Sequence, residues 1–372
     1  MLDEHWGYVS DPVRLERFER AIRAVVKPGA LVADLACGTG VLGLLCLKAG
    51  ADHVYAIDHG PMLEVARETV ARNGLAERVT LIAGRSEGAT LPRAVDVLIC
   101  DNVGWFGFDY DILSMLGDAR RRFLKPGGGV LPRRLGLQIA PVSSERCRAL
   151  AGRWAAHGVP AEFHWLQEWD TNTKHPIELA REDLTGDPAN LASLDLCREQ
   201  PSFASWRVAL EAGAAGPLDG LGGWFECELA PGVSMTNSPL ADERIQRQQV
   251  FLPIAERVDL NAGDPIEVTV MARPAEHLIA WSVSLPRMGR RFDHSTWHGM
   301  PLSPQALVRA RPDRAPQPSA AGRARGLVLS YCDGSRTRSE IEAAVLREHP
   351  TLLPSPEEIS RFVVDVIARD TQ

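Results

Sequence analysis

The chain has 372 residues, of which 45% are hydrophobic and 24% charged, and its formal net charge is −7. This length predicts two or three domains of an ordinary globular protein. The negative charge argues against nucleic acid as a partner, because binding to phosphate backbones needs a surplus of cations. No apolar run is long enough to span a bilayer, no signal segment precedes the first helical pattern, and the seven cysteines form no CxxC pair. We therefore expect a cytoplasmic protein with no membrane contact, no disulfide and no metal site.

The first part of the chain alternates between helical patterns and short apolar runs. Apolar residues at helical spacing predict a helix over 12–26, which Lys27-Pro-Gly-Ala30 ends. Strands are then expected at 31–35, 54–57, 79–83 and 95–101, helices at 41–49, 62–73 and 111–124, and a turn at Lys125–Gly129. This order predicts an α/β domain over residues 1–141, with a doubly wound, Rossmann-like sheet that binds its ligand at the carboxyl ends of the strands.

The pattern changes beyond residue 142. A helix is expected over 145–156, and alternating apolar and polar residues follow in 224–229, 247–252, 266–271 and 278–285. Alternation of this kind, with glycine and proline between the runs, predicts an antiparallel β-barrel or sandwich over 142–310. A proline- and alanine-rich linker then leads into a small unit over 311–372, with an apolar run at Leu327–Tyr331 and three short helical patterns.

Two acidic residues and a glycine turn mark the candidate ligand site. Asp34 lies in the first strand, Gly38 and Gly40 follow it, and Asp58 ends the second strand. Glycines let the backbone turn tightly and approach a ligand, and an acid at the end of the second strand accepts hydrogen bonds from ribose hydroxyls. The pattern therefore predicts a nucleotide-binding site.

The same residues resemble the cofactor loop of S-adenosyl-L-methionine (AdoMet)-dependent methyltransferases, and residues 4–300 resemble the protein arginine methyltransferases. The resemblance rests on His5-Trp-Gly7, on the glycine motif with Ala36 in the place of its first glycine, on Asp101–Trp105 and on Ala119–Gly128. It implies AdoMet as the cofactor, held by Arg14 at its carboxylate, by Asp34, Gly38 and Gly40 along the loop, by Asp58 at the ribose and by Glu87 at the adenine amino group.

The acceptor side departs from that family. The family orients a guanidinium with two glutamates, whereas here Asp101 takes the first position and Tyr110 the second, and Ile245–Gln249 replaces the family's threonine-histidine-tryptophan loop. We expect Asp101 to hold the acceptor and Trp6, Trp105 and Tyr110 to line its pocket, with Asp101 and Tyr110 as catalytic residues. The predicted function is AdoMet-dependent methylation of a peptide or protein side chain, with arginine N-methylation as one alternative and a non-catalytic peptide-binding scaffold as another.

Two histidines near the end of the predicted barrel are further candidates. Phe292-Asp-His-Ser-Thr-Trp-His298 contains His294, which could take a proton from a nucleophile, and His298, which could contact the substrate. The alternative is that both side chains satisfy hydrogen bonds at the barrel end. Neither has a carboxylate at metal-ligand spacing.

The last unit resembles PqqD-like domains, small winged-helix modules that bind leader peptides. The resemblance rests on Cys332–Thr337 followed by Glu340-Ile341, and on Phe362–Ile367 as the last helix. It implies a leader-bearing precursor peptide of a natural-product pathway as the partner, added as a strand to an exposed sheet edge. The alternative is a helical cap that stabilises the barrel or a homodimer.

Overall fold

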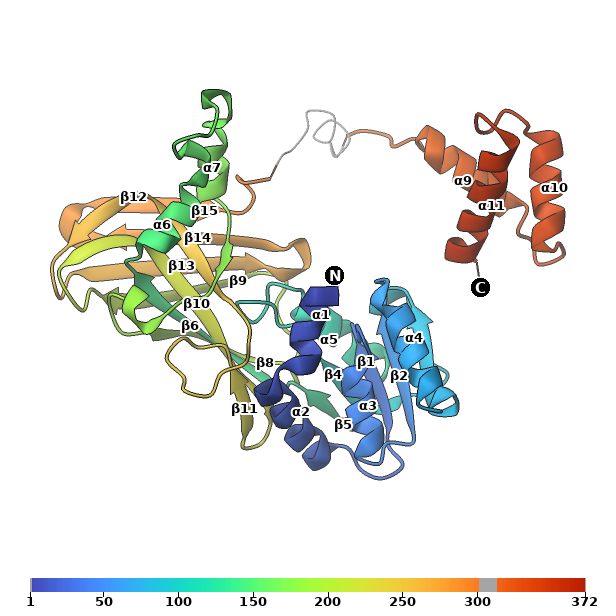
Figure 1. Ribbon diagram of the computed structural model, residues 1–372, viewed down its shortest axis with the longest axis horizontal. Coiled ribbons are helices and arrows are strands. Elements are labelled where there is room, and N and C mark those ends of the chain that lie inside the picture. The colour runs from blue at the N-terminus through green and yellow to red at the C-terminus, as the bar shows by residue number, and fades with distance from the viewer. Residues whose placement is uncertain (1, 301–312, 372) are drawn as a thin grey trace. The chain divides into compact units, whose positions relative to one another are not determined.

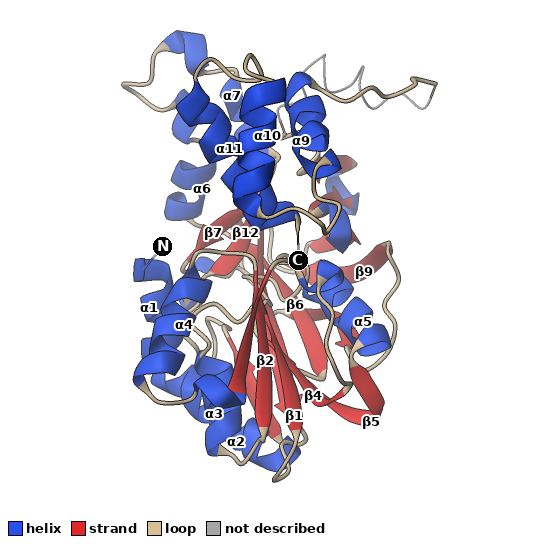
Figure 2. Cartoon of the chain, turned by 90° about the vertical axis from the view of Figure 1, so that its right-hand side faces the viewer, coloured by secondary structure: helices blue, strands red, loops and turns tan. Residues whose placement is uncertain are grey.

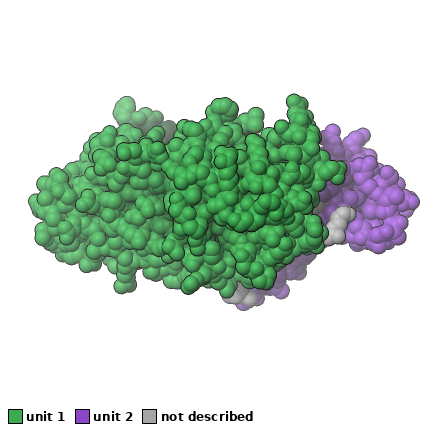
Figure 3. Space-filling model, turned by 90° about the horizontal axis from the view of Figure 1, so that it is seen from below, with its two compact units in different colours: residues 1–300 green, residues 301–372 purple. Residues whose placement is uncertain are grey.

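The computed structural model describes residues 2–300 and 313–371. The chain divides into two compact units, residues 1–300 and residues 301–372, which Figure 3 colours separately. The two domains expected for residues 1–141 and 142–310 therefore contribute to a first unit that ends at Met300. No helix within the described ranges has both the length and the hydrophobicity needed to cross a membrane.

The first unit begins with a five-stranded parallel sheet in the order β3-β2-β1-β4-β5 (Figure 1). Its strands are β1 (Leu31–Leu35), β2 (His53–Asp58), β3 (Val79–Ala83), β4 (Val95–Cys100) and β5 (Leu124–Leu131). Helices α1 (Leu2–Ser10), α2 (Pro12–Val25), α3 (Val41–Lys48) and α4 (Met62–Arg72) lie on one side of the sheet, and α5 (Ile112–Arg122) lies on the other (Figure 2). The predicted Rossmann-like fold is confirmed.

Burial explains why these strands are nearly continuous apolar runs. All five residues of β1 are buried, as are the last four of β4, because helices cover both faces of the sheet. The strand order reverses between β1 and β4, which opens a crevice at their carboxyl ends.

The prediction of a turn at Lys125–Gly129 was wrong, because these residues lie inside β5. Val95 of β4 pairs with Leu124, and Val97 pairs with Gly129, so the residues between them bulge out of the ladder. Gly127 has a φ of +76°, which the bulge requires.

Two antiparallel sheets follow, as the alternating pattern predicted. One has the order β7-β12-β10-β6-β8, with β11 beside β10, and the other has the order β15-β14-β13-β9. Their strands are β6 (Arg134–Val142), β7 (His175–Ile177), β8 (Ala189–Asp195), β9 (Ala204–Glu211), β10 (Gly216–Ala230), β11 (Val233–Thr236), β12 (Gln249–Leu260), β13 (Pro265–Arg273), β14 (Leu278–Leu285) and β15 (Arg290–Ser295). We call these two sheets together the β domain.

Short helices complete the first unit. The helix expected over 145–156 ends early, since α6 covers Glu145–Ala151 and Gly152 is its C-cap. It is followed by α7 (Leu166–Thr171) in the projecting segment of Figure 1. The remaining 3₁₀ turns are η1 (Ala76–Arg78), η2 (Ser86–Gly88), η3 (Arg153–Ala155), η4 (Ala161–Phe163), η5 (Arg181–Asp183), η6 (Pro274–Glu276) and η7 (Pro286–Met288).

The parallel sheet and the β domain share one hydrophobic core. Buried residues from both belong to the same cluster, from Phe18 and Leu98 in the first domain to Phe225 and Val268 in the second. A hydrogen bond from Asn237 Nδ2 to the carbonyl oxygen of Trp105 (2.9 Å) also joins them. The β domain is therefore fixed against the loops that follow β4.

Residues 313–371, the described part of the second unit, contain three helices, α9 (Ala320–Ser330), α10 (Arg338–Glu348) and α11 (Pro356–Asp370). They enclose a separate core, made by Val328, Ile341, Val345, Ile359, Val363 and Val366. Within residues 313–371 the structure has no strand, and Leu327–Tyr331 lies at the end of α9, where Val328 is buried against the other helices. The winged-helix expectation is corrected accordingly: this unit has helices but no sheet edge in its described part.

Candidate active site

The glycine turn lies between β1 and α3 and is held by backbone conformation. Ala36, Gly38 and Gly40 have φ angles of +51°, +53° and +77°. The amide of Cys37 donates to the carbonyl oxygen of Ile57 (3.1 Å), which ties the loop to β2. Ala36 thus takes the left-handed conformation, usually a glycine's, at a cost of about 1–2 kcal/mol. The turn therefore keeps its geometry without its first glycine.

Asp58 connects the ends of the first two strands. Its Oδ2 accepts a hydrogen bond from the Gly38 amide (2.8 Å), and its Oδ1 accepts one from the Gly60 amide (2.6 Å). A Cβ on Gly38 would lie 3.0 Å from Cε1 of His5, so α1 approaches the loop closely. The close approach explains why a glycine is needed at this position.

Asp34 fixes the start of α3. Its side chain is buried, and its Oδ2 accepts a hydrogen bond from the Gly43 amide (2.8 Å). Burial raises the pKa of Asp34 to about 7, although the Gly43 amide and the charge of Arg14 act in the opposite direction. This carboxyl group therefore titrates near neutral pH.

A cavity at the carboxyl ends of β1, β2 and β4 brings most of the predicted cofactor residues together. We call it the loop cavity. Its lining includes Arg14, Asp34, Gly38, Asp58, Asp101 and Tyr110. Gly40 is not in this lining but forms the N-cap of α3 beside it.

A second cavity adjoins the first, and we call it the adenine-side cavity after the contact that the sequence resemblance implies for Glu87. It shares Ala36, Asp58, His59, Asn102, Tyr110 and Met115 with the loop cavity and adds Glu87 and Trp105. Arg122 of α5 fixes the segment that carries Glu87, because its guanidinium donates to the carbonyl oxygens of Ser86 and Ala89. The two cavities together form one continuous depression along the strand ends.

Asp101, at the end of β4, is held between two arginines. Its Oδ2 lies 2.6 Å from Nε of Arg14 and 3.0 Å from Nη2 of Arg247, and its Oδ1 lies 3.4 Å from Nη1 of Arg247. All three side chains are at most 8% exposed. Burial alone would raise the pKa of Asp101, but the guanidiniums of Arg247 and Arg14 outweigh it and hold the pKa below its usual value. Asp101 is therefore a buried carboxylate.

The two arginines also share the ring of Tyr8 in α1. The guanidinium carbon of Arg247 lies 5.2 Å from the centre of this ring, and that of Arg14 lies 5.6 Å from it. Arg14 also donates to the carbonyl oxygen of Tyr8. The α1 helix thus covers the charged cluster from outside.

The loop after β4 carries the remaining predicted acceptor residues. Tyr110 packs edge-to-face against Trp105 with 5.2 Å between ring centres. The neighbouring Asp109 also lines the adenine-side cavity, but its buried carboxylate accepts from the Phe106 amide (2.8 Å) and pairs with Lys174 Nζ (2.9 Å). Asp109 therefore anchors this loop.

A third cavity lies between α1, the loop after β4 and the segment before β12. We call it the acceptor cavity. It is lined by Gly7, Tyr8, Asp11, Arg14, Trp105, Tyr110, Gln246, Arg247 and Gln248. Tyr110 lines all three cavities, so it lies where the acceptor cavity meets the other two.

The structure does not bring three of the predicted residues to these cavities. His294 lies in β15 and stacks on Trp281 with 5.3 Å between ring centres, and its two ring nitrogens have no hydrogen-bond partner among the described residues. Burial lowers its pKa to about 4, so the ring is neutral at pH 7. His298 is exposed in the turn after β15, and Trp6 is 69% exposed on α1. We remove all three from the candidate site.

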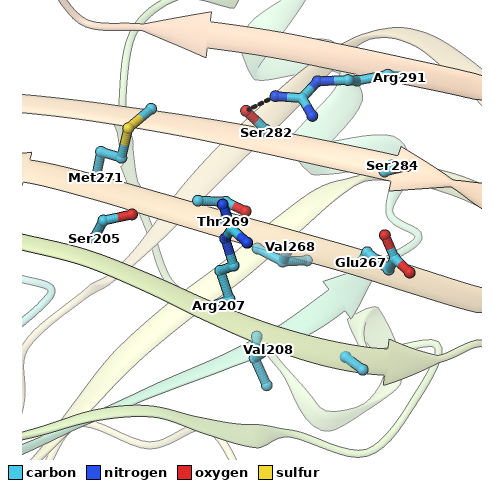
Figure 4. Close-up of a pocket in the computed structure, with 11 residues that line it drawn as sticks. Ser205, Arg207, Val208, Glu267, Val268, Thr269, Met271, Ser282, Ser284 and Arg291 are labelled. Carbon is cyan, nitrogen blue, oxygen red and sulfur yellow. Dashed lines mark hydrogen bonds between the residues drawn. The ribbon is translucent and has the colours of Figure 1, made fainter.

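Other candidate sites are absent or separate. Among the described residues, no group of three or more His, Cys, Asp and Glu side chains is placed to hold a metal ion. A polar hollow lies on the outer face of the four-stranded sheet, where Arg291 donates to Ser282 beside Arg207 and Glu267 (Figure 4). It shares no lining residue with the three cavities.

Sequence reasoning missed several residues that line these cavities. They are Tyr8, Asp11 and Arg247 in the acceptor cavity and Lys174 in the adenine-side cavity. The sequence placed Arg247 only in the loop that replaces the family's threonine-histidine-tryptophan segment, without indicating its partner. Asp11 could have been recognised as the N-cap of the helix that begins at Pro12, whereas Lys174 and Asp109 pair across 65 positions.

Known proteins resemble this chain in sequence and in fold. Residues 32–128 match a family model described as a methyltransferase domain. Protein arginine N-methyltransferase 1 of Schizosaccharomyces pombe is 34% identical over 289 residues, which cover 73% of this chain and 83% of that protein. A probable protein arginine N-methyltransferase 6 of Arabidopsis thaliana is 39% identical over 145 residues, but the match spans only 32% of its length.

The fold comparison extends over both domains of the first unit. A protein arginine methyltransferase 1 enzyme-prozyme complex of Trypanosoma brucei, solved with AdoHcy, superposes with a TM-score of 0.68. The match covers 79% of this chain and 98% of that one at 20% identity. At this identity the likeness concerns the fold.

Proposed function

This chain belongs to the protein arginine N-methyltransferase family, and from that membership we propose that it is an AdoMet-dependent methyltransferase acting on a side chain of a protein or peptide. One observation carries the proposal: the loop cavity, the adenine-side cavity and the acceptor cavity adjoin one another at Tyr110. A cofactor bound along the strand ends would therefore face an acceptor that enters beside the β domain.

The residues present fit AdoMet. Nη2 of Arg14 has no hydrogen-bond partner among the described residues, and the loop cavity in which it lies can receive a carboxylate. Asp58 lies at the end of β2, where ribose hydroxyls bind, and Glu87 lines the adenine-side cavity. Left-handed backbone at Gly38 and Gly40 lets the ligand approach the main chain.

The chain's own contribution to the reaction is orientation. When bound, AdoMet supplies a methyl group on a sulfonium ion, which a nucleophile attacks in line. Trp105 and Tyr110 form the wall that the acceptor would contact. The low pKa of Asp101 makes it a weak base at neutral pH, so it orients a group or balances its charge. Catalysis would depend mainly on proximity and alignment.

Arginine is the first acceptor to test, because the relatives named above are described as protein arginine N-methyltransferases. A second candidate is a nitrogen or oxygen nucleophile without a positive charge. The observation that favours it is the double ion pair of Asp101 with Arg14 and Arg247, two residues of the acceptor cavity, which leaves this carboxylate unavailable to an incoming guanidinium.

Methyl transfer from labelled AdoMet tests the proposal. Full-length protein is incubated with peptides that differ only in a central arginine, histidine, tyrosine, glutamine or glutamate, and the products are analysed by mass spectrometry. We expect a single product that disappears with Asp58→Ala but persists with Asp52→Ala, whose exposed side chain is at the opposite end of β2. AdoMet binding without transfer to any peptide would favour the non-catalytic scaffold.

We also propose that the second unit binds part of a polypeptide substrate, such as the leader of a precursor peptide. Its separate core supports an independent role, and the absence of a strand in residues 313–371 means that a peptide would contact helices. Deleting residues from Pro316 onward should weaken the binding of a leader-bearing peptide far more than the binding of a peptide without its leader. Steady-state kinetics on both peptides measures this difference. Equal losses for both peptides would make the unit a structural cap.

A homodimer is the remaining proposal on partners. The Trypanosoma brucei relative is described as a heterotetrameric complex, which supports self-association as a property to test in this chain. Light scattering coupled to gel filtration would give the mass of the full-length protein. A mass of one chain at all concentrations would contradict the proposal.

A further inference from the structure

Arg247 forms an ion pair with Asp101, the carboxylate that an acceptor cation would need. It lies in the segment before β12, its side chain is 8% exposed, and both terminal nitrogens of its guanidinium face the oxygens of Asp101 at 3.0 and 3.4 Å. The Tyr8 ring covers it at 5.2 Å. This two-point contact resembles the way a substrate guanidinium would bind a carboxylate.

Asp11, the carboxylate in the lining of the acceptor cavity, is also committed. Asp11 is 2% exposed, its Oδ1 accepts from the Arg14 amide (3.0 Å) and its Oδ2 accepts from the Gln246 amide (2.6 Å). The second bond holds the segment that carries Arg247 in place. Asp109, in the loop after β4, is neutralised by Lys174.

The formal charges around the acceptor cavity therefore cancel. Asp11 and Asp101 contribute two negative charges, and Arg14 and Arg247 contribute two positive ones. A guanidinium that entered would leave a net positive charge in a buried place and would have to displace Arg247 from Asp101. A neutral group of the same shape would do neither, and burying an uncompensated charge is costly.

We propose that Arg247 is a specificity-determining residue: it competes with an acceptor guanidinium for Asp101 and so favours an uncharged acceptor over a cationic one. This inference rests on the proposed function and concerns only its acceptor. An arginine acceptor would bind only to the extent that it displaces Arg247.

The test compares two peptides that differ by one charge. Citrulline has the shape of arginine without its positive charge, so a glycine-flanked arginine peptide and its citrulline counterpart form a matched pair. Their affinities are measured by calorimetry on the full-length protein saturated with AdoHcy, for the wild type, Arg247→Gln and Arg247→Lys. Arg244→Gln is the control, because Arg244 lies three residues away and pairs with Glu178 at the surface.

We expect the wild type to bind the citrulline peptide at least as tightly as the arginine peptide. Arg247→Gln should shift the preference toward arginine by about tenfold or more, because it removes the competing cation. Arg247→Lys keeps the charge and should keep the wild-type preference, as should Arg244→Gln.

A wild-type preference of tenfold or more for arginine would overturn the inference, and so would a preference that Arg247→Gln leaves unchanged. The wild-type and lysine results decide the matter if the glutamine variant does not fold. Failure of the proposed function is distinguishable, since in that case the wild type would not bind AdoHcy or would transfer no methyl group to any of the test peptides.

Discussion

The cofactor side and the acceptor side of this site are built in different ways. Asp34, Gly38, Gly40 and Asp58 lie within 25 residues of one another, and their hydrogen bonds are mostly to nearby backbone amides. The acceptor side depends on side chains from distant segments, since Asp101 meets Arg14 across 87 positions and Arg247 across 146. The cofactor side is therefore built from one short motif. The acceptor side depends on a side chain from a remote loop, Arg247.

Removing the charge of Asp101 should have the largest effect. Asp101→Asn leaves two buried guanidiniums without a carboxylate and should lower the free energy of unfolding of the first unit by about 3–5 kcal/mol. In an Arg247→Gln background the same change should cost clearly less, because one of the two cations is gone. All nine tryptophans lie before residue 301, so urea unfolding followed by tryptophan fluorescence reports this unit. Additive losses would show that the two side chains act independently.

The loop after β4 offers a second test of the acceptor side. Gly104 has a φ of +62°, and a Cβ there would lie 2.3 Å from Oδ1 of Asp109. Gly104→Ala should cost about 2–4 kcal/mol of unfolding free energy, from backbone strain and displacement of Asp109. Gly127→Ala is the control, because it has a φ of +76° and no atom within 4 Å. Equal costs would mean that Asp109 does not anchor the loop.

The pH dependence of AdoMet binding tests the cofactor side of the site. Burial raises the pKa of Asp34 to about 7, so the fold binds this proton more tightly than the unfolded chain does. Its contribution to stability is therefore greatest at low pH and is lost as the pH rises through 7. AdoMet carries a net positive charge and should favour the ionised carboxylate, so its affinity should rise about threefold to tenfold from roughly pH 6 to pH 8.

Asp34→Asn separates this effect from that of other groups in the cavity. The variant should bind AdoMet with little change in affinity across the same range, measured by calorimetry. A wild-type affinity that falls as the pH rises would contradict the assignment.

The sequence predicted the parallel sheet and the glycine turn because both depend on local patterns. Strand β1 at Leu31–Leu35 and strand β3 at Val79–Ala83 were predicted to the residue. The bulge in β5 was missed, because a run of glycines indicates a turn whether or not a strand continues beyond it. The helical form of Leu327–Tyr331 was uncertain for a similar reason, since a short apolar run has no distinct period.

The acceptor side was only partly predictable. Asp101, Trp105 and Tyr110 could be recognised from their resemblance to the family's acceptor loop, but their partners could not. Nothing in the sequence pairs Arg247 with Asp101 or Lys174 with Asp109, because those contacts depend on how the β domain packs against the sheet. His294 of β15 shows the converse error: it has suitable chemistry, but it is buried in the β domain.

A titration of the full-length protein with AdoMet tests most directly whether the two sides are separate. The wild type should show saturable binding, and Asp58→Ala should weaken it by about 1.5–3 kcal/mol, the range for a hydrogen bond to a charged group. Arg247→Gln should leave the AdoMet affinity within about twofold of the wild type, because that side chain serves the acceptor cavity. No binding by the wild type, or equal losses in the two variants, would contradict the account.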